Sequence, residues 1–447
     1  MVDDQQALDW LFGFTDWERG IGWGIRVSPD LSWNLGRTRW LLDALGSPDR
    51  RVPIVLIAGT KGKGSTAALV ESIARAAGQH TLLYTQPHLQ EYRERIRVDG
   101  IPIAPGELAK LTECLHEPVE RLIREQPEAG EPTTYEITTA MALLAAELHQ
   151  ADLAIIEVGL GGRLDATNCL DPVISAITRI SYDHTQILGK TLEAIAREKV
   201  AIARVERPLV SAPQRPAAQR AIMRSAREIG ARHRFVSPLR YLGRALLHDM
   251  PVQRVGGAFF TTPFEASLAL LGDHQRENAA VAVAICEELS RLGHVSIDML
   301  AIRTGLESVR WPGRLELFSG PPRIVLDGAH NGESAARLAA ALRESFSFKN
   351  LILVLGILRD KDAPAILREL LPAARTVVVT RSANSRSLEP AELARQARQH
   401  CDRVRVAPAV SDALDEACAI AGADDLICVT GSLALVGEAR ELLTRNL

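Results

Sequence analysis

Short apolar runs alternate along the chain with longer segments in which apolar residues recur at helical spacing. The runs VPIVLIAG from Val52, ADLAIIEVG from Ala151 and VISAITRI from Val173 are apolar almost throughout and rich in β-branched residues. This pattern is typical of strands that helices cover on both faces. The segments STAALVESIARAAG from Ser65 and TTAMALLAAELHQ from Thr138 predict helices, each ending near a glycine or a polar break. The alternation therefore predicts βαβ units around a mostly parallel sheet, an α/β fold.

The same alternation begins again after WPGRLE at Trp311, with the predicted strands PRIVLDG, NLILVLGI, TVVVT and DLICVTGS. A single hydrophobic core rarely grows beyond roughly 250 to 300 residues, so the 447 residues predict two domains. We place a phosphate-loop domain at residues 1–309 and a smaller Rossmann-like α/β domain at 310–447. The stretch from Ser211 to Gly272 is rich in Arg and Pro without a clean period, and we expect strands and loops there, at the edge of the first domain.

Composition narrows the class of protein. With 47% hydrophobic and 24% charged residues the chain has the composition of a folded globular protein. A net charge of -3 provides no broad basic field, which argues against nucleic acid as a main partner. The start MVDDQQALDW is unlike a targeting segment, and no run approaches the roughly 18 apolar residues of a membrane span, so we expect a cytoplasmic protein without a membrane partner. The six cysteines form no CxxC pair, and we expect free thiols.

The first candidate chemistry follows the strand that starts at Val52. That strand leads into a glycine-rich loop and then a helix, the context in which backbone amides close around phosphate oxygens and a lysine adds a point charge. The loop departs from the strict P-loop pattern, because Ile57 replaces its first glycine and Gly64 separates Lys63 from Ser65. A flexible glycine turn with incidental lysines is the alternative. The residues of the predicted phosphate loop are Gly59, Thr60, Lys61, Gly62, Lys63, Gly64 and Ser65.

Further polar residues lie where predicted strands end. Glu157 closes an apolar strand, a position from which a carboxylate can reach a phosphate loop and hold Mg²⁺, although a chance carboxylate at a strand end is the alternative. His184 follows the next strand, where an isolated histidine is more often solvated than a metal ligand. Lys199 falls in a predicted helix, where a lysine is usually a surface charge.

The loop has the form GTxGKGS, and here the sequence resembles the bifunctional dihydrofolate synthase/folylpolyglutamate synthase family of the Mur ligase superfamily. From about Val52 to the end, further segments match that family in its order, whereas the first fifty residues, with GIGWGIRVSPDLSW, match less well. The matching segments are TQPHLQEYRERIRVDG from Thr85, TTYEITTAMALL from Thr133, EVGLGGRLDATN from Glu157, ITRISYDHTQILGKTLEAIAREK ending at Lys199, HQRENAAVA from His274, WPGRLE from Trp311, DGAHN from Asp327, GILRDKD from Gly356 and TGSLALVGE from Thr430.

The resemblance implies an ATP- and Mg²⁺-dependent, ADP-forming ligase, acting as a monomer on glutamate and dihydropteroate or a folate. It implies that a substrate carboxylate becomes an acyl phosphate, which the amine of glutamate then attacks. Its catalytic residues would be Lys63, Glu157, His184 and Lys199. Its metal ligands would be Ser65, Gln86, Glu157, His184 and Lys199, the last as a carbamate. ATP would also meet Asn278 at the adenine, Arg314, and Asp327 at the ribose, with His330 and Ser432 near ATP and glutamate.

Several positions depart from the family pattern. Gln86 stands where the family usually has a serine that helps to bind the second metal, and Val200 and Ala201 change its EKAGI to EKVAI. Gly332 replaces the proline that usually follows Asn331. Tyr135 stands where bifunctional members often have phenylalanine, and its hydroxyl needs a partner when buried.

Two alternatives stay open. A peptidoglycan-type Mur ligase acting on another carboxylate would normally carry an additional N-terminal domain, whereas only about fifty residues precede Val52. A non-catalytic nucleotide-binding paralogue is the other alternative, which the glutamine at position 86 keeps open.

Overall fold

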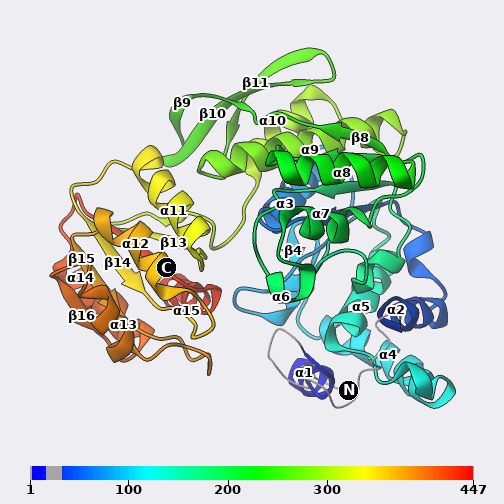
Figure 1. Cartoon of the computed structure of the whole chain (residues 1–447), viewed down its shortest axis with the longest axis horizontal. Coiled ribbons are helices and arrows are strands. Elements are labelled where there is room, and N and C mark those ends of the chain that lie inside the picture. The colour runs from blue at the N-terminus through cyan, green and yellow to red at the C-terminus, as the bar shows by residue number, and fades with distance from the viewer. Residues whose placement is uncertain (1–2, 17–32, 446–447) are drawn as a thin grey trace.

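The computed structural model describes residues 3–16 and 33–445, so nearly all of the GIGWGIRVSPDLSW segment lies outside the described residues. The described chain folds around two parallel-rich sheets, each with helices on both faces, that lie side by side in Figure 1. The first sheet belongs to the N-terminal two thirds of the chain and the second to the remainder, as the restart of the sequence pattern predicts. Both expected α/β units are present.

The first sheet has eight strands, and only β3 runs antiparallel to the others, between its neighbours β2 and β4. Its central strand β1 lies between β5 and β6, so the chain leaves β1 toward one side of the sheet and later passes to the other. Ligands of α/β sheets bind at the carboxyl edge beside such a change of direction. In spatial order the strands are β4 (Ile101–Pro102), β3 (Ile96–Val98), β2 (Thr81–Tyr84), β5 (Leu153–Glu157), β1 (Ile54–Ala58), β6 (Ile174–Ile177), β7 (Pro208–Ser211) and β8 (Arg232–Phe235).

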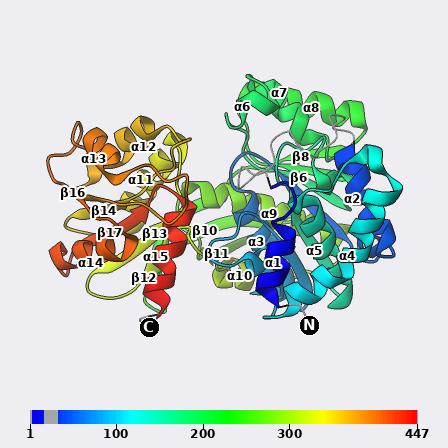
Figure 2. The ribbon, with the colours of Figure 1, turned by 90° about the horizontal axis from the view of Figure 1, so that it is seen from below.

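Alternate residues of the central strands face two separate cores. In β1, Leu56 packs into one core whereas Val55 and Ile57 pack into the other, as the two-residue period of a strand requires. One face is covered by α1 (Asp4–Leu11), α2 (Trp33–Ala44), α4 (Glu107–Glu125), α5 (Thr134–Leu148), α7 (Leu192–Val200) and α8 (Pro216–Ile229). The other is covered by α3 (Lys63–Ala76), α9 (Asp273–Arg291) and α10 (Met299–Ser308). Figure 2 shows α1, α4 and α5 together on the first face.

The segment from Ser211 to Gly272 differs in part from its prediction. It contains a regular helix, α8, whose buried stripe consists of Ala218, Ala221, Ile222 and Ala226. The arginines Arg220, Arg224 and Arg227 also recur at helical spacing on its opposite face, so the period is present in the sequence and was overlooked. After β8, the strands β9 (Arg240–Leu247), β10 (Met250–Phe259) and β11 (Thr262–Leu268) form a separate antiparallel sheet, visible at the top of Figure 1. The predicted strands are therefore present in this segment, whereas the prediction that it contains only strands and loops was wrong.

The second sheet has six strands, with the edge strand β12 antiparallel. In spatial order they are β12 (Glu316–Phe318), β13 (Arg323–Asp327), β17 (Leu426–Thr430), β14 (Leu351–Leu355), β15 (Thr376–Val379) and β16 (Val404–Val406). On one face lie α11 (Gly332–Ser345), α12 (Ala363–Leu370) and α13 (Pro390–Ala397), and on the other α14 (Val410–Ile420) and α15 (Leu433–Arg445).

Short helices complete the described elements: α6 (Thr185–Leu188) and the 3-10 helices η1 (Pro48–Arg50), η2 (Tyr92–Arg95), η3 (Pro127–Ala129), η4 (Ala166–Cys169) and η5 (Leu371–Ala373). No helix within residues 3–16 or 33–445 combines the length and apolarity needed to cross a bilayer. The six cysteines are free thiols, as expected.

The two sheets meet beside the carboxyl edge of the first one. The loop after β2 reaches α15, where a Cβ on Gly437 would lie only 2.1 Å from the carbonyl oxygen of Leu89. Arg440 of the same helix pairs with Glu316 and also hydrogen-bonds the side chain of Gln90. Glycine at 437 thus allows backbone of the first domain to pack directly on a helix of the second.

Candidate active site

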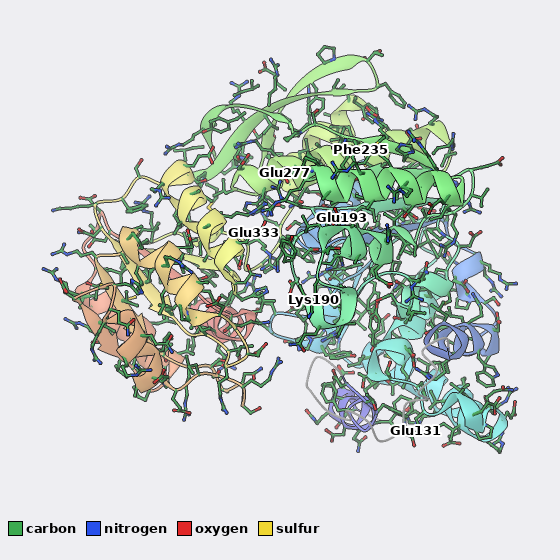
Figure 3. The ribbon with its side chains drawn as sticks, viewed as in Figure 1. Glu131, Lys190, Glu193, Phe235, Glu277 and Glu333 are labelled. Carbon is green, nitrogen blue, oxygen red and sulfur yellow. The ribbon has the colours of Figure 1, made fainter. Side chains whose placement is uncertain are left out.

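A pocket of about 1350 Å³ lies between the two sheets and is lined by residues of both. The first sheet contributes the loops after β1, β2, β5 and β6, together with the start of α9. The second contributes the loops after β13, β14, β15 and β17. Glu277 of α9 and Glu333 of α11, labelled in Figure 3, line it from the two sides. The carboxyl ends of both sheets therefore face one shared cavity.

The predicted phosphate loop connects β1 to α3, which begins at Lys63. Gly62 caps that helix with φ +91°, and a Cβ there would lie 2.3 Å from Oδ1 of Asn278, so only glycine suits this position. The N-terminus of α3 directs its unpaired backbone N–H groups at the pocket, where they favour an anion. Gly59 has another role. It does not line the pocket, and its missing side chain makes room for Thr178.

Lys63 and Glu157 meet at the carboxyl edge because their strands are neighbours. Glu157 pairs in register with Ile57 of β1, and its Oε1 lies 3.6 Å from the Lys63 Nζ. Glu157 is 5% exposed. Burial raises the pKa of its carboxyl, and the Lys63 charge opposes that rise. A backbone N–H bond from Gln86, at 3.4 Å, reaches the other carboxylate oxygen. A buried carboxylate thus stands beside the phosphate loop, as the sequence predicts.

Lys61 turns toward the loop after β6. Its Nζ lies 2.7 Å from a carboxylate oxygen of Asp183, and that ammonium holds the pKa of Asp183 at about 2 even though burial opposes the shift. The next residue, His184, adopts a left-handed conformation with φ +47° at the start of α6 and lines the pocket. A non-glycine residue in this conformation is strained, and such strain often occurs at ligand sites.

Lys199, on α7, is a buried amine and is 4% exposed. Its ammonium forms no hydrogen bond or ion pair with any of the described residues. Burial and the nearby Lys63 charge lower its pKa to about 7, so a large part of the amine is neutral at physiological pH. A Cβ on Gly162 would lie 2.9 Å from the Lys199 carbonyl oxygen, which shows how tightly the loop after β5 packs on α7. Lys199 itself does not line the pocket, whereas Glu198 does.

A chain of side chains links α9 to the phosphate loop. Asn278 donates to the Oε1 of Gln275 at 2.9 Å, and Gln275 donates to the Ser65 hydroxyl at 3.4 Å. These three residues are buried and line the pocket. Burial also lowers the pKa of the adjacent His274 to about 3, so its ring is neutral. This wall is polar, uncharged and close to the loop, which suits the base and sugar of a nucleotide.

The second domain contributes the predicted residues of its DGAHN segment. Both carboxylate oxygens of Asp327 accept backbone N–H bonds, from Leu315 at 3.0 Å and Ala329 at 2.9 Å, so Asp327 also shapes the two turns beside it. A Cβ on Gly328 would lie 2.5 Å from Nη1 of Arg314, so the glycine leaves room for that side chain in its present position. His330 donates from Nδ1 to the Gly328 carbonyl oxygen at 2.8 Å, which leaves its Nε2 as an acceptor. Ser432 lies at the same wall.

The structure brings most of the predicted site residues to one pocket. Gly59 and Lys199 are the two that do not line it. The sequence analysis did not single out Asp165, which lines the pocket and accepts a 2.8 Å hydrogen bond from the Tyr135 hydroxyl. It also missed Trp311, whose ring packs on Gly64 of the predicted phosphate loop. Both residues lie in segments that the family resemblance includes, but no pattern indicated their contacts.

The donor set near the phosphate loop suits a small hard cation. Within residues 3–16 and 33–445, no three His, Cys, Asp or Glu side chains converge as a metal cluster. A cation beside Ser65 and Glu157 would therefore complete its shell with phosphate oxygens and water, which is the usual way in which proteins bind Mg²⁺. The residues present fit that ion.

Known proteins resemble this chain in both fold and amino-acid sequence. The description "Mur ligase middle domain" matches residues 57–286, and "Mur ligase, glutamate ligase domain" matches residues 313–433. The chain is 35% identical to the dihydrofolate synthase/folylpolyglutamate synthase of Bacillus subtilis over 373 residues, 82% of each chain. It is 37% identical to a probable bifunctional folylpolyglutamate synthase/dihydropteroate synthase of Haloferax volcanii, covering 91% of this chain but 48%, about half, of that relative's length.

The fold of a solved structure matches that of this protein over almost the whole chain. The folylpolyglutamate synthase of Mycobacterium tuberculosis complexed with ADP superposes with a TM-score of 0.84 and 32% identity, covering 98% of this chain and 99% of that one.

Proposed function

The chain belongs to the Mur ligase family, and from this premise we propose that it is an ATP-dependent, ADP-forming ligase that joins L-glutamate to dihydropteroate, to folates or to both. The observation that carries the proposal is the pocket itself, where Lys63 and the buried Glu157 face residues of the second domain. The names of the Bacillus relative and of the Mycobacterium structure, which contains ADP, support the same substrates. Small molecules are thus its proposed partners, and we propose that it acts as a monomer.

The phosphate loop and α9 would hold ATP. The triphosphate would lie at the N-terminus of α3 under Lys63, and the base would lie against the wall that contains Asn278. Arg314 and Asp327 approach the same space from the second domain, the first as a cation for phosphate and the second as an acceptor for ribose hydroxyls. ATP would then be held by both domains at once, which couples its binding to their closure.

The chemistry proceeds in two displacement steps. A carboxylate oxygen of the pterin-containing substrate attacks the γ-phosphorus of ATP, ADP leaves, and an acyl phosphate forms. The amine nitrogen of glutamate then attacks the acyl carbon, inorganic phosphate leaves, and an amide remains. Lys63 stabilises negative charge on the transferred phosphoryl group, while closure of the two domains over the pocket would keep water from the acyl phosphate. His330 and Ser432 lie on the wall from which glutamate would approach.

Magnesium, when bound, would neutralise charge on the β- and γ-phosphates. Ser65 and Glu157 would hold it beside the phosphate loop, and His184, Gln86 and Lys199 would serve a second ion. A neutral Lys199 amine can form a carbamate with carbon dioxide, losing a proton and becoming an anionic oxygen ligand. Its burial and its pKa of about 7 favour this modification, because an ordinary lysine is almost fully protonated at neutral pH.

The substrate assignment is tested by offering the purified protein ATP, glutamate and either dihydropteroate or tetrahydrofolate. We expect glutamate-dependent phosphate release with both, and dihydrofolate as the product from dihydropteroate. Mass spectrometry of the products separates the two activities. Extension of tetrahydrofolate alone would leave a folylpolyglutamate synthase, and release with neither substrate would refute the proposal.

Loss of either Glu157 or His184 is expected to raise the magnesium concentration at half-maximal activity by about 10-fold or more, since each removes one ligand from a site with few protein ligands. The measurement is a Mg²⁺ titration of Glu157→Ala and His184→Ala at saturating ATP. Glu333→Gln is the matched control, because Glu333 lines the same pocket without belonging to the proposed metal set. Unchanged titrations in both alanine variants would remove these residues from the metal site.

A further inference from the structure

The phosphate loop and the loop after β6 are joined at several points. The backbone N–H groups of Thr60 and Lys61 donate to the carbonyl oxygen of Arg179, at 3.0 and 3.2 Å. The Thr60 hydroxyl also donates to the carbonyl oxygen of Ser181 at 3.2 Å. The two loops lie side by side because β1 and β6 are neighbouring parallel strands that end at the same edge of the sheet.

One pair of side chains adds to this contact at the pocket. The Lys61 ammonium donates to Oδ2 of Asp183 at 2.7 Å, and the two side chains are partly buried, with exposed fractions of 22% and 29%. A lysine of a phosphate loop is expected to offer its charge to a phosphate. The charge of Lys61 is instead already neutralised by a carboxylate, which indicates a different role.

Asp183 uses its second carboxylate oxygen on the next residue. Its Oδ1 accepts from the backbone N–H of His184 at 3.1 Å, and Nε2 of the His184 ring lies 3.8 Å from the same oxygen. His184 has the left-handed conformation, with φ +47°, which costs free energy in a residue other than glycine. The carboxylate that Lys61 holds therefore stabilises the turn from which His184 lines the pocket.

We propose that Lys61 is a positioning residue and not a phosphate ligand: through Asp183 its ammonium fixes the loop after β6 to the phosphate loop, so that His184 faces the pocket before any nucleotide binds. This rests on the proposed function only in taking the phosphate loop to be the nucleotide site. Lys63, beside Glu157, remains the cation for phosphate. A site whose loops are already fixed loses less conformational entropy when its ligand binds.

Hydrogen–deuterium exchange of the ligand-free protein tests the ion pair, with Lys61→Met, Asp183→Asn and the double variant. The readout is residues 181–188, where the amides of His184, Ile187 and Leu188 are hydrogen-bonded. Each single variant should speed their exchange by roughly 10-fold, since a hydrogen bond between charged groups is lost. The double variant should exchange no faster than either single one, because both changes remove the same contact.

Two further variants complete this experiment. Lys61→Arg keeps a cation that can reach Asp183 and should restore slow exchange. Lys190→Met is the matched control, because it removes an exposed lysine close to the same segment but outside the pocket (Figure 3), and its exchange should equal that of the wild type. Unchanged exchange in Lys61→Met, or additive acceleration in the double variant, would overturn the proposal.

The affinity for ADP, measured by calorimetry in EDTA, separates positioning from phosphate binding. Asp183→Asn removes a negative charge from the pocket, so charge alone predicts tighter binding of the anion. Loss of the fixed loop predicts weaker binding, by about 3-fold or more, and this is the result that we expect. Tighter or unchanged binding would show that Lys61, once released, serves as a phosphate ligand, against the proposal. If the wild type bound no ADP, the phosphate-loop assignment would fail, and the exchange experiment would still decide the role of the ion pair.

Discussion

Replacing Lys63 by alanine is expected to lower kcat/KM for ATP by about 100-fold or more, equivalent to about 2.7 kcal/mol of transition-state stabilisation. The side chain carries its charge at the start of α3, beside the buried Glu157 and at the pocket in which we propose that the transferred phosphate lies. Removing it deletes a preorganised charge where negative charge develops, and it leaves the Glu157 carboxylate without its cation. The measurement is steady-state phosphate release with ATP varied at saturating glutamate and folate.

The matched control for this loss is Lys110→Ala, which removes an exposed lysine of α4 outside the pocket. Its kcat/KM should equal that of the wild type. Circular dichroism should show both variants folded, since Lys63 faces the pocket and not a core. If kcat and the affinity for ATP both stayed near wild type in Lys63→Ala, the loop after β1 would not be a phosphate site.

Replacing Arg37 by alanine is expected to destabilise the N-terminal domain by about 3 to 5 kcal/mol, because it leaves a buried carboxylate without its partner. Arg37 of α2 is fully buried and binds Glu136 through two nitrogens, at 2.8 and 2.7 Å, and also donates to the carbonyl oxygen of Ala129 at 2.8 Å. Burial already raises the pKa of Glu136, and the arginine opposes that rise. The measurement is urea unfolding followed by a probe of this domain.

Two further variants test this explanation. In Arg37→Met with Glu136→Leu no charge stays buried, and much of the lost stability should return. Arg254→Ala breaks the exposed pair with Glu265 across β10 and β11 and should change stability far less. If Arg37→Ala unfolded within about 1 kcal/mol of the wild type, the pair would be no more costly to break than a surface ion pair.

The elements that the sequence predicted well are those with strong local patterns. Runs such as LAIIE are buried at every position in β5, and they were recognisable because both faces of the sheet are covered. The helix predicted from Thr138 is present as α5, but it begins four residues earlier, at Thr134, because Thr133 and Glu136 form a capping box that the sequence analysis did not use. By contrast α8 was missed although its residues follow a helical period, because its buried stripe consists mainly of small alanines and was not recognised as an apolar face.

The candidate site also contains features that the sequence predicted and contacts that it did not. The order of motifs predicted which residues approach ATP, and the structure places most of them at one pocket. The motifs gave no indication that Lys61 pairs with Asp183, 122 positions away, or that the missing side chain of Gly59 makes room for Thr178. Such contacts depend on which strands become neighbours, and a motif contains no information about its neighbour.

The sequence by itself therefore determined the α/β class, the positions of most central strands, the glycine-rich loop between the first central strand and its helix, and the family. These properties depend on patterns within some ten to twenty residues, where backbone geometry and burial act locally. Only the tertiary structure decided that Arg37 lies beside Glu136, 99 positions away, that Lys199 is buried, and that Tyr135 donates to Asp165. The physical reason is that desolvation and hydrogen bonding depend on every atom around a group, and those atoms come from segments that only folding brings together.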